Sequence, residues 1–241
     1  MFARLGRGAR RIGLPLVIVV AALLALVLSR HRSTPPDFGA TQVVRVGVSQ
    51  GASIPGYLAD SRSRLATLAA GGAGTAVDAL VSFDDYLSPD AVAQALTGVQ
   101  TFQVYERVPL PHTQTAIVKI AVTRLPGDLL AGMEAEAGRR AEDARRTGDP
   151  VAAAEADRYR AHCSCGYAAV VRADAATLAA LATRPTVRAV DPAPAVTDLS
   201  RAVFLPPLPE QSGTAQPPDD SGASAAGPAA GGSPSGWPSR R

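Results

Sequence analysis

Residues 79–108 read ALVSFDDYLSPDAVAQALTGVQTFQVYERV, and this stretch decides the predicted fold. It begins with apolar, β-branched residues that favour a strand. Ser88 followed by Pro89 is typical of a helix start, because serine caps free N–H groups and proline fits the first turn. Residues 101–108 alternate apolar and polar side chains, which indicates a half-buried strand with Arg107 on its polar side. The stretch therefore predicts a strand–helix–strand unit.

A second unit of the same kind follows at 166–190. Residues 167–172 predict a strand, Asp174 is a suitable cap for the next helix, and residues 187–190 predict a closing strand. Two such units are typical of a β-α-β-β-α-β sandwich, in which two helices cover one face of an antiparallel sheet. We therefore expect an α+β fold.

Further elements are expected around this sandwich. Residues 43–48 and 54–70 predict a strand and a helix that form a lead-in layer, and residues 115–122 predict an extra strand. A helical hairpin is predicted at about 126–162, inserted between the strands. Together these segments form one expected extracytoplasmic domain, 42–200.

The apolar stretch 12–29 reads IGLPLVIVVAALLALVLS and carries no charge. As a helix with a rise of ~1.5 Å per residue, it is long enough to cross the ~30 Å hydrocarbon core of a membrane. Its length, and the lack of a small-residue cleavage site after it, favour an uncleaved signal-anchor over a cleaved signal peptide. Four arginines precede it and two follow it. We therefore expect a single-pass protein of the cell membrane, with 1–11 cytoplasmic, 30–41 a linker and the domain outside.

The basic charge of the chain belongs to the predicted anchor. Six of the 24 basic residues flank residues 12–29, and no acidic residue precedes Asp37. The remaining 18 basic residues are outweighed by all 21 acidic residues, so the rest of the chain has a net charge of −3. A nucleic-acid-binding domain would need the opposite sign and a basic face. We expect no nucleic-acid partner.

Residues 201–241 are rich in Pro, Gly, Ser and Ala. Such a composition buries too little apolar surface to order a chain, so a disordered tail is predicted. The PPLP motif at 206–209 could form a polyproline helix for a partner, or act as a spacer. Trp237 could touch a surface.

Two resemblances add to these predictions. Residues 166–191, with AAVVRAD, LAAL and PTVRAVD in series, resemble the second half of subtilisin-type propeptide and inhibitor domains. That resemblance implies a ferredoxin-like sandwich and a protease inhibitor or foldase role. The order of anchor, ALVSFDDYLSPD segment, helical hairpin and C-x-C-x-YAAVVRA segment resembles single-pass envelope proteins of high-GC Gram-positive bacteria. This second resemblance implies a location in the cell envelope and carries no activity.

The most specific chemical feature is the sequence His162-Cys163-Ser164-Cys165. In an oxidising compartment outside the membrane, Cys163 and Cys165 could form a local disulfide if the chain turns between them. A metal site with His162, Cys163 and Cys165 would lack the usual fourth ligand. A redox-active pair and an intermolecular disulfide are further alternatives, although a position after a helix C-terminus disfavours thiolate.

The sequence contains no complete catalytic set. Residues 47–51, GVSQG, fit the G-x-S-x-G motif, but a nucleophile elbow needs a helix directly after Ser49 and several β-α units before it. Only His112 and His162 could act as its base. Asp84-Asp85 could do acid–base work or hold a cation, but loop solvation and turn chemistry explain the pair better. We expect no catalytic residue, no cofactor and no metal.

The sequence therefore predicts a membrane-anchored, non-enzymatic binding or scaffold protein of the cell envelope, with an envelope protein as its partner. One alternative is a propeptide-like protease inhibitor. A second is an envelope hydrolase or thiol-redox protein, which would lose turnover in the variants Ser49→Ala or Cys163→Ser.

Overall fold

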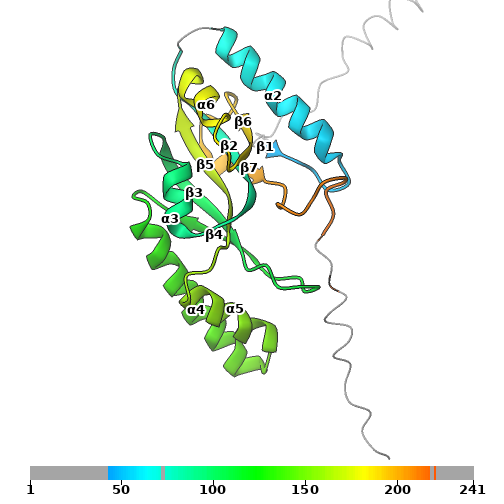
Figure 1. Ribbon diagram of the computed structural model, residues 1–241, viewed down its shortest axis with the longest axis vertical. Coiled ribbons are helices and arrows are strands. Elements are labelled where there is room, and N and C mark those ends of the chain that lie inside the picture. Colours follow the sequence, from blue (N-terminus) through cyan, green and yellow to red (C-terminus); the bar gives the residue numbers. More distant parts are fainter. Residues whose placement is uncertain (1–42, 72–73, 218–219, 221–241) are drawn as a thin grey trace, which may run out of the picture. The chain divides into compact units, whose positions relative to one another are not determined.

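Five strands form the main sheet, and their order in space differs from their order in the chain (Figure 1). They are β2 Val77–Leu87, β3 Gln100–Arg107, β4 Ile117–Ala121, β5 Gly166–Ala173 and β6 Val187–Pro192. The spatial order is β4-β3-β5-β2-β6, and every neighbouring pair is antiparallel. The computed structural model describes residues 43–71, 74–217 and 220. Because β5 lies between β2 and β3, the two strand–helix–strand units are interleaved.

Two short helices cover one face of this sheet. They are α3 Pro89–Ala95 and α6 Ala175–Leu181. Both start at the predicted caps: Ser88 Oγ accepts a hydrogen bond from the Ala91 N–H (3.4 Å), and Asp174 Oδ1 accepts one from the Thr177 N–H (2.8 Å). The apolar residues of both helices share one core with those of β2, β3 and β5.

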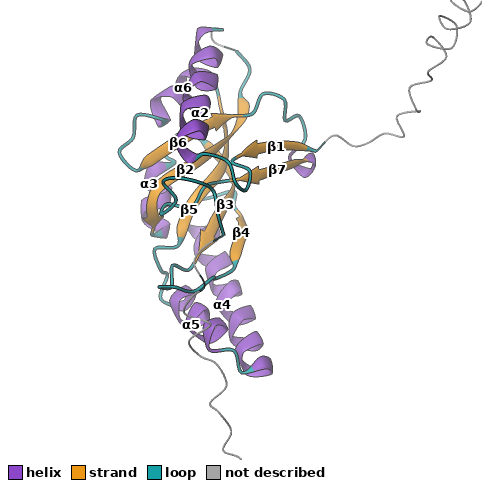
Figure 2. Cartoon of the chain, turned by 90° about the vertical axis from the view of Figure 1, so that its right-hand side faces the viewer, coloured by secondary structure: helices purple, strands orange, loops and turns teal. Residues whose placement is uncertain are grey.

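A helical hairpin lies between β4 and β5 in the chain (Figure 2). Its helices are α4 Gly127–Thr147 and α5 Pro150–Arg160. Gly148 ends α4 in the left-handed conformation (φ 72°), and its N–H donates to the Ala144 carbonyl (2.8 Å). Asp149 then caps α5. The hairpin is joined to the main core by apolar residues of α4, namely Leu129, Met133 and Ala137.

A second, smaller sheet consists of two parallel strands (Figure 2). They are β1 Val44–Gly47 and β7 Ala202–Leu205. A 3-10 turn at Leu199–Arg201 precedes β7, and helix α2 Ile54–Ala70 is the next element after β1. Gly47 has a φ of 110°, and a Cβ there would collide with the Leu205 carbonyl. Glycine is therefore needed where the two strands meet.

The small sheet and the residues after it cover the other face of the main sheet. We call residues 206–217 the C-terminal segment. The side chains that form this second core come from both sheets, from the connection after β6 and from the C-terminal segment: Val46, Leu80, Tyr105, Tyr167, Ala168, Val170, Ala193, Val196, Phe204 and Leu208. The main sheet is therefore buried on both faces, which explains why its central strands have few exposed residues.

The predicted fold class was wrong. It placed one ferredoxin-like sandwich between a transmembrane helix and a disordered tail that began at residue 201. The structure is an α+β arrangement of five α-helices and two sheets across the described residues. Strand β7 and the C-terminal segment lie in the part predicted to be disordered, and they are ordered because Phe204, Leu208 and Ala215 are buried.

The predicted membrane helix cannot be located in this structure. Across residues 43–71 and 74–217, no helix is long and apolar enough to cross a membrane. The predicted anchor 12–29, the N-terminus 1–11 and the linker 30–41 lie outside the described residues, as does Trp237.

Candidate functional site

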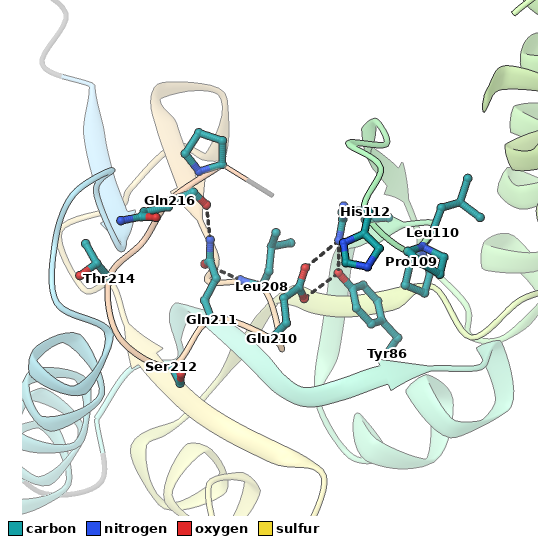
Figure 3. A pocket seen from close by; sticks show the side chains of 13 residues that line it. Tyr86, Pro109, Leu110, His112, Leu208, Glu210, Gln211, Ser212, Thr214 and Gln216 are labelled. Carbon is teal, nitrogen blue, oxygen red and sulfur yellow. Dashed lines mark hydrogen bonds and ion pairs between the residues drawn. The ribbon is translucent and has the colours of Figure 1, made fainter. Parts of the chain in front are cut away.

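Two adjoining hollows lie along the C-terminal segment. The first has a volume of about 620 Å³, and its walls include Tyr86, Arg107, Leu110, His112 and Glu210 (Figure 3). The second has a volume of about 420 Å³, and its walls include Gln50, Tyr105, Ile117, Lys119 and Tyr167. The two hollows share four lining residues, Leu208, Gln211, Gln216 and Pro217. We refer to the two adjoining hollows together as the C-terminal groove.

A buried arginine dominates the first hollow. Arg107 Nη1 donates to Glu210 Oε1 (2.7 Å) and to the Tyr86 hydroxyl (2.8 Å), and Tyr86 in turn donates to Glu210 Oε2 (3.0 Å; Figure 3). Arg107 Nη2 also donates to the Thr113 carbonyl (3.2 Å). The Arg107 side chain is 4% exposed, whereas that of Glu210 is 48% exposed. The cation is thus held inside the protein, and its carboxylate partner faces solvent.

Arg107 was not predicted to be a site residue. The alternation in residues 101–108 placed it on a solvated side, but the residue is only 3% exposed. The prediction failed because the C-terminal segment covers that side of β3. No local pattern around Arg107 signals this, since the covering residues lie about a hundred positions further along the chain.

A second arginine binds the backbone of the C-terminal segment. Arg188, in β6, donates from Nη1 to the carbonyls of Leu208 (3.0 Å) and Pro209 (3.3 Å), and from Nη2 to the carbonyl of Gln211. A guanidinium has five donors in a fixed planar arrangement, so it can hold several carbonyls at once. Arg188 therefore fixes the segment that carries Glu210.

The floor of the second hollow is aromatic. The rings of Tyr105 and Tyr167 lie edge to face, 6.2 Å apart, and Lys119 Nζ lies 5.4 Å from the centroid of Tyr105. Burial raises the pKa of Tyr105 to about 12 and raises those of Tyr86 and Tyr167 further. These hydroxyls therefore stay protonated at neutral pH, so they donate hydrogen bonds and do not act as bases.

The cysteine pair forms a disulfide. Cys163 and Cys165 are bonded, with their Cα atoms 5.4 Å apart. The required turn is present: His162 has a φ of 50°, and the Cys163 N–H donates to the Arg158 carbonyl (3.1 Å), which ends α5 in a Schellman motif. Because both sulfurs are in the disulfide, they are not free to hold a metal with His162.

The other predicted candidates do not converge. Ser49 is exposed in a turn whose Gly51 has a φ of 81°, and it lines neither hollow. His112 lines the first hollow, whereas His162 contacts Glu134 (3.1 Å). Asp84 and Asp85 are exposed within β2. Across the described residues, no three His, Cys, Asp or Glu side chains are placed to hold a metal ion.

One buried carboxyl cluster was also missed by the sequence analysis. Glu106, Glu136 and Glu155 are each less than 5% exposed, and they lie where β3 meets the helical hairpin. Glu136 binds Arg139 and Arg140, and Glu155 accepts a hydrogen bond from the Ala116 N–H (3.0 Å). We interpret the cluster as part of the packing of the hairpin.

Comparisons with known proteins do not assign this chain to a family. No family model, curated protein or solved structure matches it. The fold and the groove define a small α+β domain with a surface groove that contains a buried cation. Its function is therefore inferred from the chemistry of its own residues.

Proposed function

We propose that this chain is a non-enzymatic, extracytoplasmic binding protein of the cell envelope, which holds an extended segment of a partner protein in the C-terminal groove. The main evidence for this proposal is an exposed apolar side chain on an edge strand of the main sheet, beside the groove. Ile117 is 52% exposed, lies on β4 at the edge of the main sheet, and lines the second hollow.

A free edge strand suits an extended partner. Among the described residues, no strand lies beside the outer side of β4, so this edge can pair with an added strand. An added strand would cover the Ile117 side chain. Within the described residues, Val43 is the other large hydrophobic residue with comparable exposure, at 51%.

The groove also supplies groups that recognise side chains. Tyr105 and Tyr167 form an aromatic floor for apolar or proline residues, and Lys119 favours an acidic neighbour. The two hollows adjoin each other along Leu208, Gln211, Gln216 and Pro217, so a single peptide could contact both.

Binding accounts for the groove better than catalysis does. His112 and Ser212 both line the first hollow, but Figure 3 shows them far apart, on either side of Glu210. Hydrolysis would need a serine within hydrogen-bond reach of its base. Arg107 Nη1, the Tyr86 hydroxyl and the Glu210 carboxylate are paired with one another, as in a recognition site.

The Cys163–Cys165 disulfide supports the extracytoplasmic part of the proposal, because disulfides persist in oxidising compartments. Attachment to the cell membrane stays a prediction from residues 12–29.

The proposal is tested by proximity labelling in the native host with three full-length proteins: wild type, Ile117→Arg and Val43→Arg. The last is a matched control, since it makes the same change at an equally exposed site. We expect a reproducible set of envelope proteins with wild type and Val43→Arg, and its loss with Ile117→Arg. Equal labelling by all three would contradict the proposal. Inhibition of secreted serine proteases by purified wild type would favour the protease-inhibitor alternative.

A further inference from the structure

We propose that the Arg107 end of the C-terminal groove is a carboxylate-binding site, in which Glu210 holds the place of an acidic side chain of the bound partner segment. The inference deepens the proposed function and rests on it. It names the chemistry of the ligand: an extended peptide with a glutamate or aspartate next to proline or apolar residues.

Arg107 is built as a receptor for an anion. Its side chain is 4% exposed, and its guanidinium is oriented by the Thr113 carbonyl and the Tyr86 hydroxyl. Its Nε is buried and has no hydrogen-bond partner. A charge as deeply buried as this one is costly unless it is paired, and the planar donors of a guanidinium match the two oxygens of one carboxylate. Any segment that occupies this site must therefore present a negative group.

Glu210 can be exchanged without disturbing the fold. Its side chain is 48% exposed, and it lies in a turn outside any helix or strand. Its neighbours hold the segment independently: Leu208 is buried, and Arg188 binds the carbonyls of Leu208, Pro209 and Gln211. Rotation of the Glu210 side chain into solvent would free Arg107 and Tyr86 while the backbone stays in place. One carboxylate would then replace another, so the net exchange costs little.

The hollow beside Glu210 has room for the incoming group. Its volume of about 620 Å³ falls within the range of roughly 300–1,000 Å³ that is usual for ligand sites. One wall consists of Pro109, Leu110 and Pro111, which offers an apolar surface next to the charged pair (Figure 3). This combination favours an acidic residue flanked by proline or an aliphatic side chain. The chain's own sequence Leu208-Pro209-Glu210 has this pattern.

The test uses a fluorescently labelled peptide with the sequence PPLPEQ, which copies residues 206–211. Its affinity is measured by fluorescence anisotropy for full-length wild type, Glu210→Gln and Glu142→Gln. Glu142 is a matched control, because it is an exposed glutamate paired with Arg145 on α4. We expect Glu210→Gln to bind about tenfold more tightly than wild type or the control, since the internal competitor is gone.

Three further arms make the result specific. The peptide PPLPQQ should bind Glu210→Gln no more tightly than it binds wild type, because it lacks the carboxylate. The double variant Arg107→Lys/Glu210→Gln should not bind PPLPEQ more tightly than wild type does, because lysine keeps the charge but lacks the planar arrangement of donors. Far-UV circular dichroism checks that each variant is folded. Acetate should compete only weakly. Equal affinity of all three proteins, equal binding of both peptides, or competition by acetate as strong as by the peptide would each overturn the inference.

The two proposals fail in different ways. If Ile117→Arg abolishes partner labelling while Glu210→Gln leaves peptide affinity unchanged, the binding function stands and the carboxylate site is wrong. If labelling is unaffected by Ile117→Arg, the binding function itself is contradicted.

Discussion

At the scale of single residues, burial changes what a side chain can do in this protein. Glu106 is 1% exposed, and its Oε2 has no hydrogen-bond partner. Burial, and to a lesser degree the charge of Glu136, raises the pKa of Glu106 to about 8. Tyr159 and Glu155 lie in the same cluster, and Arg140 contacts both Glu136 and Glu155. Glu106 is therefore protonated in the folded protein at neutral pH.

This pKa makes stability depend on pH. In the unfolded chain Glu106 ionises near pH 4.5, so between about pH 4.5 and 8 the folded state binds more protons than the unfolded state. Its contribution to stability is complete below pH 4.5 and is lost as the pH rises through 8. Glu106→Gln should raise the free energy of unfolding by about 1–3 kcal/mol at pH 9 and change it little at pH 4.5.

Urea denaturation at both pH values measures this effect. The control Glu142→Gln alters an exposed glutamate and should shift stability by less than about 0.5 kcal/mol at either pH. If Glu106→Gln is no more stable than wild type at pH 9, then Glu106 is ionised in the folded protein without a cost.

At the scale of elements, local signals determine where the helices begin. Helix α3 has only seven residues, and a helix so short is not stable alone in water. Its cap and its apolar face hold it in place: Ser88 binds the Ala91 N–H, and Val92 is fully buried. The same combination occurs in α6, with Asp174 as its cap.

The cap of α3 can be tested directly. Ser88→Ala removes the hydroxyl that accepts the Ala91 N–H and should lower the free energy of unfolding by about 1 kcal/mol. Ser63→Ala, at an exposed position inside α2, should leave it unchanged or slightly raise it, because alanine is the better helix former. Chemical denaturation of both variants compares them. If the cap contributes nothing to stability, Ser88→Ala and wild type will have the same denaturation midpoint.

At the scale of the whole molecule, the small sheet and the C-terminal segment together cover the second face of the main sheet. Phe204 and Leu208 pack against Tyr105 and Tyr167, and the Tyr105 hydroxyl donates to the Phe204 carbonyl (3.3 Å). Without β7 and the C-terminal segment, the second core would lose Phe204 and Leu208, and both hollows would lose part of their lining.

The substitution Leu208→Ala tests whether the C-terminal segment packs against the core, because it lowers stability only if Leu208 is buried there. Leu208 is 4% exposed, so the substitution should cost about 2–4 kcal/mol of stability, from lost apolar contacts and the cavity left behind. Leu199→Ala, at a half-buried position before β7, should cost clearly less. Thermal unfolding followed by circular dichroism compares the two. No difference between Leu208→Ala and wild type would mean that the segment contributes nothing to the fold.

Sequence alone determined the local features of this protein. The caps Ser88 and Asp174, the turn at Gly148 and the helix at 54–70 follow from interactions between residues a few positions apart, and the structure contains each of them. Only the tertiary structure decided that β7 pairs with β1, that Arg107 is buried, and that Glu210 is its partner. These features join residues about 100 or more positions apart. Alternation within one strand shows which side faces a core, but it does not show what a distant segment later covers.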